Sequence, residues 1–163
     1  MPNSDVEAAS AALYLLGHGA ITALTENSDA ARIMNALYTQ TLDEKLRSHD
    51  WNFARRRALL AALADVPSWG YAHQYQLPQS PLCLRVLSVE DADEDAWEIE
   101  TYATGSAQYR VLLTDLATVK IRYIARVTDP TLWDPLFGDA FVYELAFRAC
   151  YGLTRNAQLA EVF

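Results

Sequence analysis

The spacing of hydrophobic residues changes twice along the chain. Apolar residues recur at helical spacing near both ends and alternate with polar residues in the middle. This pattern predicts helices over about residues 4–16, 28–48 and 135–151, and a sheet between about 75 and 128. The sequence therefore predicts an α+β fold, a helical bundle with an inserted antiparallel β-meander. We expect one domain over 1–163, with a helical part at 1–50 and 130–163 and a β-rich insertion at 71–128.

The first two predicted helices carry start and stop signals. Ser4 can cap the first helix and Glu7 can reach back to it, as in a capping box. Gly17 suits the end of this helix, because glycine readily adopts the left-handed conformation of a helix cap. The second helix begins near Ser28. Its buried face is predicted to consist of Met34, Leu37, Tyr38, Thr41, Leu42 and Leu46, with Asp43, Glu44 and Arg47 outside.

The last predicted helix is apolar over most of its circumference. Asp134 and Pro135 mark its start as a cap and a first-turn proline, and Gly152 suits its end. A helix of this kind is buried within the fold or against another subunit. Residues 153–163 are expected to begin a further helix. The two apolar stripes of the last helix are Trp133, Leu136, Ala140, Tyr143, Phe147 and Cys150, and Phe137, Phe141 and Leu145.

Five segments in the middle of the chain are typical of strands: "YQLP", "LCLRVLSV", "WEIETY", "QYRVLL" and "VKIRYIARV". The acidic stretch "EDADEDAWEIE" is predicted to be a solvated hairpin tip. It lacks the features of a calcium loop, because Ala96 replaces the glycine and Tyr102 the final carboxylate that such a loop needs. Alternation in the last segment predicts a half-buried antiparallel strand, whose inner face would be Val119, Ile121, Tyr123, Ala125 and Val127.

Length and composition are those of a globular protein. The 163 residues, 52% hydrophobic and 21% charged, suffice for a sizeable core. No apolar run approaches the roughly 18 residues of a membrane helix, and the N-terminus lacks the pattern of a signal peptide. We therefore expect folding in the cytoplasm and no membrane partner. The net charge of −8 disfavours nucleic-acid binding over the whole surface, because phosphate repels an acidic protein.

Motifs for metals and cofactors are missing from the sequence. His18, His49 and His73 are scattered, no CxxC occurs, and no glycine-rich phosphate loop is present. We therefore predict no cofactor and no metal site. Cys83 and Cys150 are expected to be buried, reduced thiols.

Catalytic pairs receive equally little support. Acids such as Glu98, Glu100 and Glu144 could meet in space as a glycosidase pair, although their spacing is that of ordinary surface charge. His49 beside Asp50 is more typical of a helix end than of a catalytic dyad.

The stretch "LRSHDWNFARRR", residues 46–57, joins the long helix to the sheet. Its Trp51 and Phe53 favour burial, while Arg55, Arg56 and Arg57 favour water or phosphate. One hypothesis is a nucleic-acid-binding surface, since aromatic residues neighbour the basic ones. The other is that the aromatics pin the helix end to the sheet while the arginines pair with the protein's many acids. The net charge favours the second hypothesis.

Three longer stretches occur in a distinctive order: "LRSHDWNFARRRALLAAL", "GYAHQYQLPQSPLCLRVLSV" and "IRYIARVTDPTLWDPLFGDAFVYELAFRACYGLT". Their elements W-N-F-A, Y-x-L-P and I-R-Y-I-A-R-V-T-D-P are each weak signals, but they are specific together in this order and spacing. On these stretches the chain, from Leu15 to Thr154, resembles the tail tubular protein A family of short-tailed phages and their prophage relatives. Members of that family have a helical bundle with a β-rich insertion.

The resemblance implies a structural role as a head-to-tail adaptor, also called a connector or gatekeeper. Family members form a twelve-subunit ring beneath the portal protein and carry the next tail component, a nozzle or tube protein. We thus expect a homo-oligomeric virion protein without catalytic residues, assembled in the host cytoplasm, whose channel passes genomic DNA without specific binding. The residues expected at subunit interfaces or structural junctions are Trp51, Phe53, Arg55, Arg56, Arg57, Tyr75, Leu77, Pro78, Trp133, Phe137, Phe141 and Phe147.

Two features depart from the family's pattern. Members continue past "GLT" with a further helix and a tail that docks on the portal, whereas only residues 156–163 remain here. Either the residues for this docking contact are missing, or the sequence is shortened. "QSPL" also replaces the family's usual acid between "LP" and "CLRV". Two alternatives stay open. One is a peptidoglycan-degrading tail accessory protein, because a relative in role has been linked to cell-wall hydrolysis, and the other is a different ring protein of a phage neck or tail.

Overall fold

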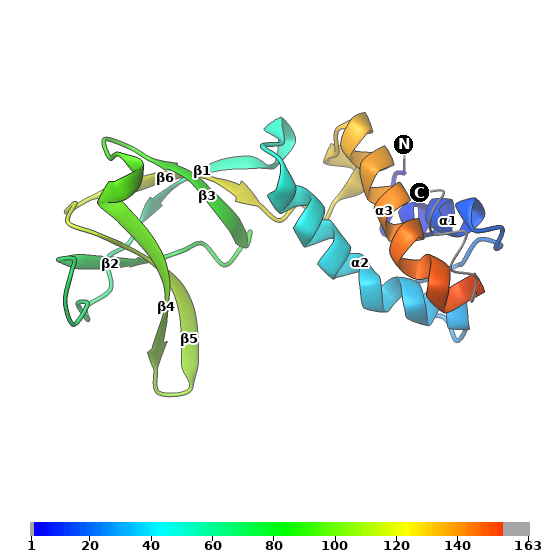
Figure 1. Ribbon diagram of the computed structural model, residues 1–163, viewed down its shortest axis with the longest axis horizontal. Coiled ribbons are helices and arrows are strands. Elements are labelled where there is room, and N and C mark those ends of the chain that lie inside the picture. The colour runs from blue at the N-terminus through cyan, green and yellow to red at the C-terminus, as the bar shows by residue number, and fades with distance from the viewer. Residues whose placement is uncertain (1, 155–163) are drawn as a thin grey trace. The chain divides into compact units, whose positions relative to one another are not determined.

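The structure, a computed structural model, describes residues 2–154 (Figure 1). It confirms the α+β fold with helices towards both ends of the chain. The helices are α1 (Asp5–Leu15), α2 (Asp29–Ser48) and α3 (Pro135–Thr154). The strands are β1 (Arg55–Leu60), β2 (His73–Gln76), β3 (Cys83–Val89), β4 (Trp97–Thr104), β5 (Ala107–Thr114) and β6 (Val119–Ala125). Short 3-10 turns lie at Asn52–Ala54, Glu94–Ala96 and Pro130–Leu132.

The chain forms two compact units. Among the described residues, the helical unit comprises 2–53 and 126–154, and the β unit comprises 54–125. The β-rich part therefore begins with β1, well before the boundary at 71 expected from the sequence. Its first strand was missed because three consecutive arginines replace the alternation of apolar and polar residues that predicts a strand.

The first two helices begin where their caps predict. The Ser4 hydroxyl accepts the Glu7 backbone N–H at 3.1 Å, and the Ser28 hydroxyl caps α2 in the same way. The Glu7 carboxylate bonds the N–H of Asn3 at 2.7 Å instead of that of Ser4, so the capping box is displaced by one residue. Gly17 has a φ of +76° and ends α1 as expected.

Helix α3 starts as predicted but ends later. The Asp134 carboxylate accepts the N–H of Leu136 at 2.9 Å, which caps the helix before Pro135. The predicted stop at Gly152 is wrong, because the helix continues to Thr154. Gly152 packs against Ile33 of α2, and an added Cβ would lie 3.4 Å from the Ile33 Cδ1 atom. The expected further helix falls partly within α3, and residues 155–163 lie outside the described residues.

The strands form two three-stranded antiparallel sheets, ordered β1-β6-β3 and β2-β5-β4. The simple meander expected from the sequence is thereby corrected, since only β4 and β5 pair as consecutive strands. The connection from β3 to β4 passes from one sheet to the other. The acidic stretch from Glu90 to Glu100 is consequently not a hairpin tip, although its residues 93–96 are exposed as expected.

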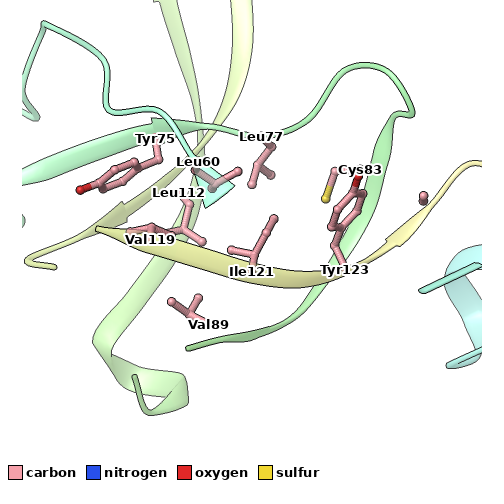
Figure 2. Close-up of a cluster of buried hydrophobic side chains, with 10 residues drawn as sticks. Leu60, Tyr75, Leu77, Cys83, Val89, Leu112, Val119, Ile121 and Tyr123 are labelled. Atoms are coloured by element: carbon pink, nitrogen blue, oxygen red, sulfur yellow. The ribbon is translucent and has the colours of Figure 1, made fainter. Parts of the chain in front are cut away.

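The core of the β unit lies between the inner faces of these sheets (Figure 2). Ile121 and Tyr123 contribute from β6, Leu112 from β5, and Cys83 from β3, all of them buried. The predicted alternation in the last strand is confirmed from Val119 to Tyr123, whereas Ile124, expected on the outer face, is fully buried. Each fully buried large apolar side chain contributes about 1.5–3 kcal/mol relative to an exposed one. The burial of Cys83 is also confirmed.

In the helical unit, α3 packs against both α1 and α2, which contact each other much less. Its core contains Phe137 and Phe141 of α3 with Leu13 of α1 and Met34 of α2, each of them fully buried. Cys150 is buried here too, as predicted. Among the helices of residues 2–154, none combines the length and apolarity that crossing a bilayer demands.

Candidate interaction surfaces

A cluster of aromatic rings surrounds Phe137 at the start of α3. Its ring centroid lies 5.2 Å from Trp51, 5.0 Å from Phe53 and 5.1 Å from Trp133, each in edge-to-face geometry. Phe141 stacks nearly parallel to it at 6.3 Å. Trp51 and Phe53 therefore hold the segment after α2 against α3. The sequence led us to expect that they pin the helix end to the sheet, whereas the ring contacts seen here join them to Phe137 of the helical unit.

Both tryptophans of this cluster also donate hydrogen bonds to the backbone. The Trp51 indole donates to the Lys45 carbonyl in the last turn of α2 at 3.0 Å. The Trp133 indole donates to the Val127 carbonyl at 3.1 Å, and only 3% of Trp133 is exposed. The cluster thus fixes the two points where the chain leaves the helical unit and returns to it. Its members act as structural anchors on which exposed surfaces can be held rigidly.

The three arginines do not form one continuous surface. They open β1, in which successive side chains point to opposite faces. Arg55 and Arg57 face one side of the sheet, opposite Ile124 and Arg122 in the register, whereas Arg56 faces the other side. All three are exposed. Arg55 and Arg57 thus share a face of the sheet with basic residues of β6, and the three arginines do not form a single basic surface.

Tyr75, Leu77 and Pro78 belong to the interior of the β unit. Tyr75 and Leu77 are each 1% exposed, and Pro78 is half-buried. The Tyr75 hydroxyl donates to the Leu116 carbonyl at 2.6 Å, and burial raises the pKa of this phenol. These residues stabilise the fold and offer little surface to a partner.

Helix α3 carries an exposed apolar stripe. We define the α3 stripe as Leu136, Tyr143, Phe147 and Tyr151, which are 73%, 53%, 46% and 68% exposed, with half-buried Ala140 between the first two. The positions recur every three or four residues and so share one helix face. The predicted stripe of Phe137, Phe141 and Leu145 is confirmed as buried, whereas most of the other predicted stripe is not buried in the single chain. Tyr143 and Tyr151 were not among the predicted interface residues, although their spacing from Phe147 could have identified them.

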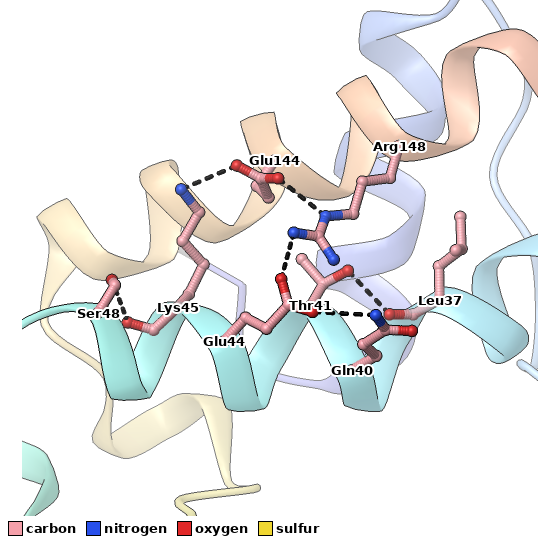
Figure 3. Close-up of polar contacts among 8 residues, drawn as sticks. All are labelled: Leu37, Gln40, Thr41, Glu44, Lys45, Ser48, Glu144 and Arg148. Atoms are coloured by element: carbon pink, nitrogen blue, oxygen red, sulfur yellow. Dashed lines mark hydrogen bonds and ion pairs between the residues drawn. The ribbon is translucent and has the colours of Figure 1, made fainter. Parts of the chain in front are cut away.

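Ion pairs join α2 to α3 (Figure 3), and their Lys45 and Glu144 line a shared hollow with Tyr143 and Phe147 of the stripe. Glu144 accepts from Lys45 at 2.9 Å and from Arg148 at 2.8 Å, and Arg148 also reaches Glu44 at 2.5 Å. Arg126, after β6, forms a two-point ion pair with Asp43. Asp43 is therefore half-buried, although the sequence placed it on the outer face of α2. These bonds hold α3 in a fixed rotation relative to α2, which determines the face that the stripe presents.

The same bonds weigh against a general-acid role for Glu144. Its hydrogen bond from Lys45, followed by that from Arg148, lowers the pKa of the carboxyl, so it remains ionised at neutral pH. An ionised carboxylate cannot act as the general acid of a glycosidase. Glu98 and Glu100 lie in the other unit, on β4. Within residues 2–154, no group of three His, Cys, Asp or Glu side chains is arranged to hold a metal ion.

A scan against models of protein families finds no match, and a search of curated proteins finds no significant similarity.

Proposed function

We propose that this chain is a structural subunit of a phage head-to-tail adaptor ring, joining the portal protein to the next tail component. The ordered sequence stretches that resemble the tail tubular protein A family support this proposal. The arrangement of helices around an inserted β unit agrees with that family's architecture. In this role the protein is assembled in the host cytoplasm and carried in the virion. Its ring, of about twelve copies by analogy with the family, encloses the channel through which DNA passes.

The observation that carries the proposal is the α3 stripe. Four large apolar side chains lie exposed along one helix face, at 46% to 73% of their area. A contiguous apolar surface of this kind is typical of a protein–protein interface. Because the ion pairs of Glu144 and Arg148 fix the rotation of α3, the stripe forms a defined surface. In a ring of identical subunits, such a surface would meet a different surface of the neighbouring copy.

Multi-angle light scattering on the purified protein tests this assignment. We expect a large closed oligomer, or a monomer that closes into a ring when portal protein is added. The variant Leu136→Ser/Phe147→Ser should reduce assembly at least about tenfold, because interface hot spots each contribute about 2 kcal/mol or more. Tyr14→Ser, at an exposed apolar position of α1 and therefore outside the stripe, is the matched control. Assembly of the double variant at the wild-type concentration would contradict the proposed use of this stripe.

A further inference from the structure

The two sheets of the β unit carry opposite charges on their outer faces. Ile121 and Tyr123 of β6 point into the core, so the residues between them in sequence point outwards. The strand register places basic residues of all three strands on this outer face of the β1-β6-β3 sheet. The basic face is Arg55, Arg57, Arg85, Lys120 and Arg122.

Acids do not balance all of these cations. Lys120 forms an ion pair with Glu90 at 2.5 Å. Within residues 2–154, no acid lies within ion-pair distance of Arg57 or Arg122, which stand directly opposite each other on β1 and β6. Like charges in this position destabilise a strand pair. The Nε atom of Arg85 is buried, and the described part of the chain offers it no acceptor. An acidic partner on this face would relieve the repulsion between the arginines.

The outer face of the β2-β5-β4 sheet has the opposite character. Glu98 and Glu100 occupy alternate positions of β4 and are both exposed. They line a hollow of about 510 Å³ between this face and the loop at residues 66–71. Buried Val111 and Leu113 form its apolar lining, and Trp69, 84% exposed, lines it from the loop. We call this the acidic hollow.

The acidic hollow has the chemistry that recognises a guanidinium group. Carboxylates bind arginine through paired charge-assisted hydrogen bonds, and a tryptophan ring attracts the planar cation to its face. The apolar lining suits the methylene groups of the arginine side chain. Tyr71 also lines the hollow and is hydrogen-bonded to Glu98; burial, and then the charge of Glu98, raise the pKa of that phenol.

We propose that the basic face of one copy, through Arg57 and Arg122, docks into the acidic hollow of the next copy. This inference rests on the proposed ring and names a contact within it. The two surfaces belong to opposite faces of one compact unit, so copies joined in this way stand head to tail, as ring closure requires. Duplex DNA is a weaker candidate for the basic face, because the chain's net charge of −8 repels phosphate at long range.

Exchanging the charges tests the contact. One variant is Arg57→Glu/Arg122→Glu, and the other is Glu98→Arg/Glu100→Arg, all at exposed positions. Each variant then brings like charges together at the proposed contact, so its self-association should weaken at least about tenfold. An equimolar mixture of the two should assemble again, because each copy then meets a neighbour of opposite charge. The quadruple variant, in which both surfaces are reversed within one chain, should also assemble.

Sedimentation velocity at about 50 and about 200 mM salt measures the association, with circular dichroism to verify folding. Arg56→Glu makes the same charge change as Arg57→Glu, but on the opposite face of β1, so it should weaken self-association less than Arg57→Glu does. The contact would be overturned if both double variants associated as strongly as the wild type. It would also be overturned if the mixture and the quadruple variant were folded and neither assembled. Either result would leave the ring proposal standing. A wild-type protein that stays monomeric both alone and with portal protein would overturn both. Tight duplex binding lost in Arg57→Glu/Arg122→Glu would instead assign the basic face to nucleic acid.

Discussion

Phe137 shows how a single residue anchors the helical unit. It is fully buried and contacts the rings of Trp51, Phe53 and Trp133 edge to face. Phe137→Ala should lower the free energy of unfolding by about 3–5 kcal/mol, because it leaves a cavity among rigid rings. Phe147→Ala, on the exposed stripe of the same helix, should change it by less than about 1 kcal/mol. Urea unfolding followed by fluorescence compares the two, and equal effects would contradict the division between core and stripe.

Glu144 should make the stability of the helical unit depend on acid pH. Its ion pairs with Lys45 and Arg148 lower the carboxyl pKa in the folded state below the ordinary value of 4.5. The stabilisation is therefore present above pH 4.5 and is lost as pH falls through the folded-state pKa. Glu144→Gln should cost about 1 kcal/mol at pH 7 and reduce the loss of stability on acidification. Unfolding curves at neutral and acid pH measure both effects, and an unchanged acid dependence in Glu144→Gln would assign the effect to other carboxyls.

At the scale of elements, a glycine just after a helix and a glycine within a helix should respond in opposite directions to the same substitution. Gly17 has a φ of +76°, so Gly17→Ala should destabilise the protein by about 1 kcal/mol. Gly152 lies within α3 with ordinary contact distance to Ile33, so Gly152→Ala should be neutral or stabilise by up to about 1 kcal/mol. Thermal melts of the two variants check this, and destabilisation by Gly152→Ala would argue that α3 ends before this residue.

The elements also show what could be predicted from the sequence. Ser4, Ser28 and Asp134 mark helix starts through local hydrogen bonds, so short-range pattern sufficed to place them. Strand β1 was not predicted, because three consecutive arginines, Arg55–Arg57, replace the alternation of apolar and polar residues. Strand pairing was not predicted either, because it depends on contacts between distant segments that the spacing of residues does not encode. The hydrophobic pattern likewise predicted that α3 is apolar over most of its circumference, but it did not show which stripe remains exposed. That choice depends on the packing of α1 and α2 and on the bonds of Glu144.

At the scale of the whole molecule, the exposed apolar surface and the charged surfaces belong to separate units. The α3 stripe lies in the helical unit, and both the basic face and the acidic hollow lie in the β unit. Each unit has its own core, so each can present a preformed surface without refolding. A subunit that must join identical neighbours on two sides needs at least two such surfaces, which differ from each other in a head-to-tail ring.

Cryo-electron microscopy of the purified protein mixed with portal protein tests the central claim most directly. The proposed function predicts closed rings of this chain, about twelve copies each by family analogy, stacked coaxially on the portal. It further predicts that Leu136→Ser/Phe147→Ser leaves portals without a ring, because the α3 stripe then lacks its apolar contacts. The assignment would be contradicted if folded wild-type protein, in large excess over the portal protein, formed no ring on it.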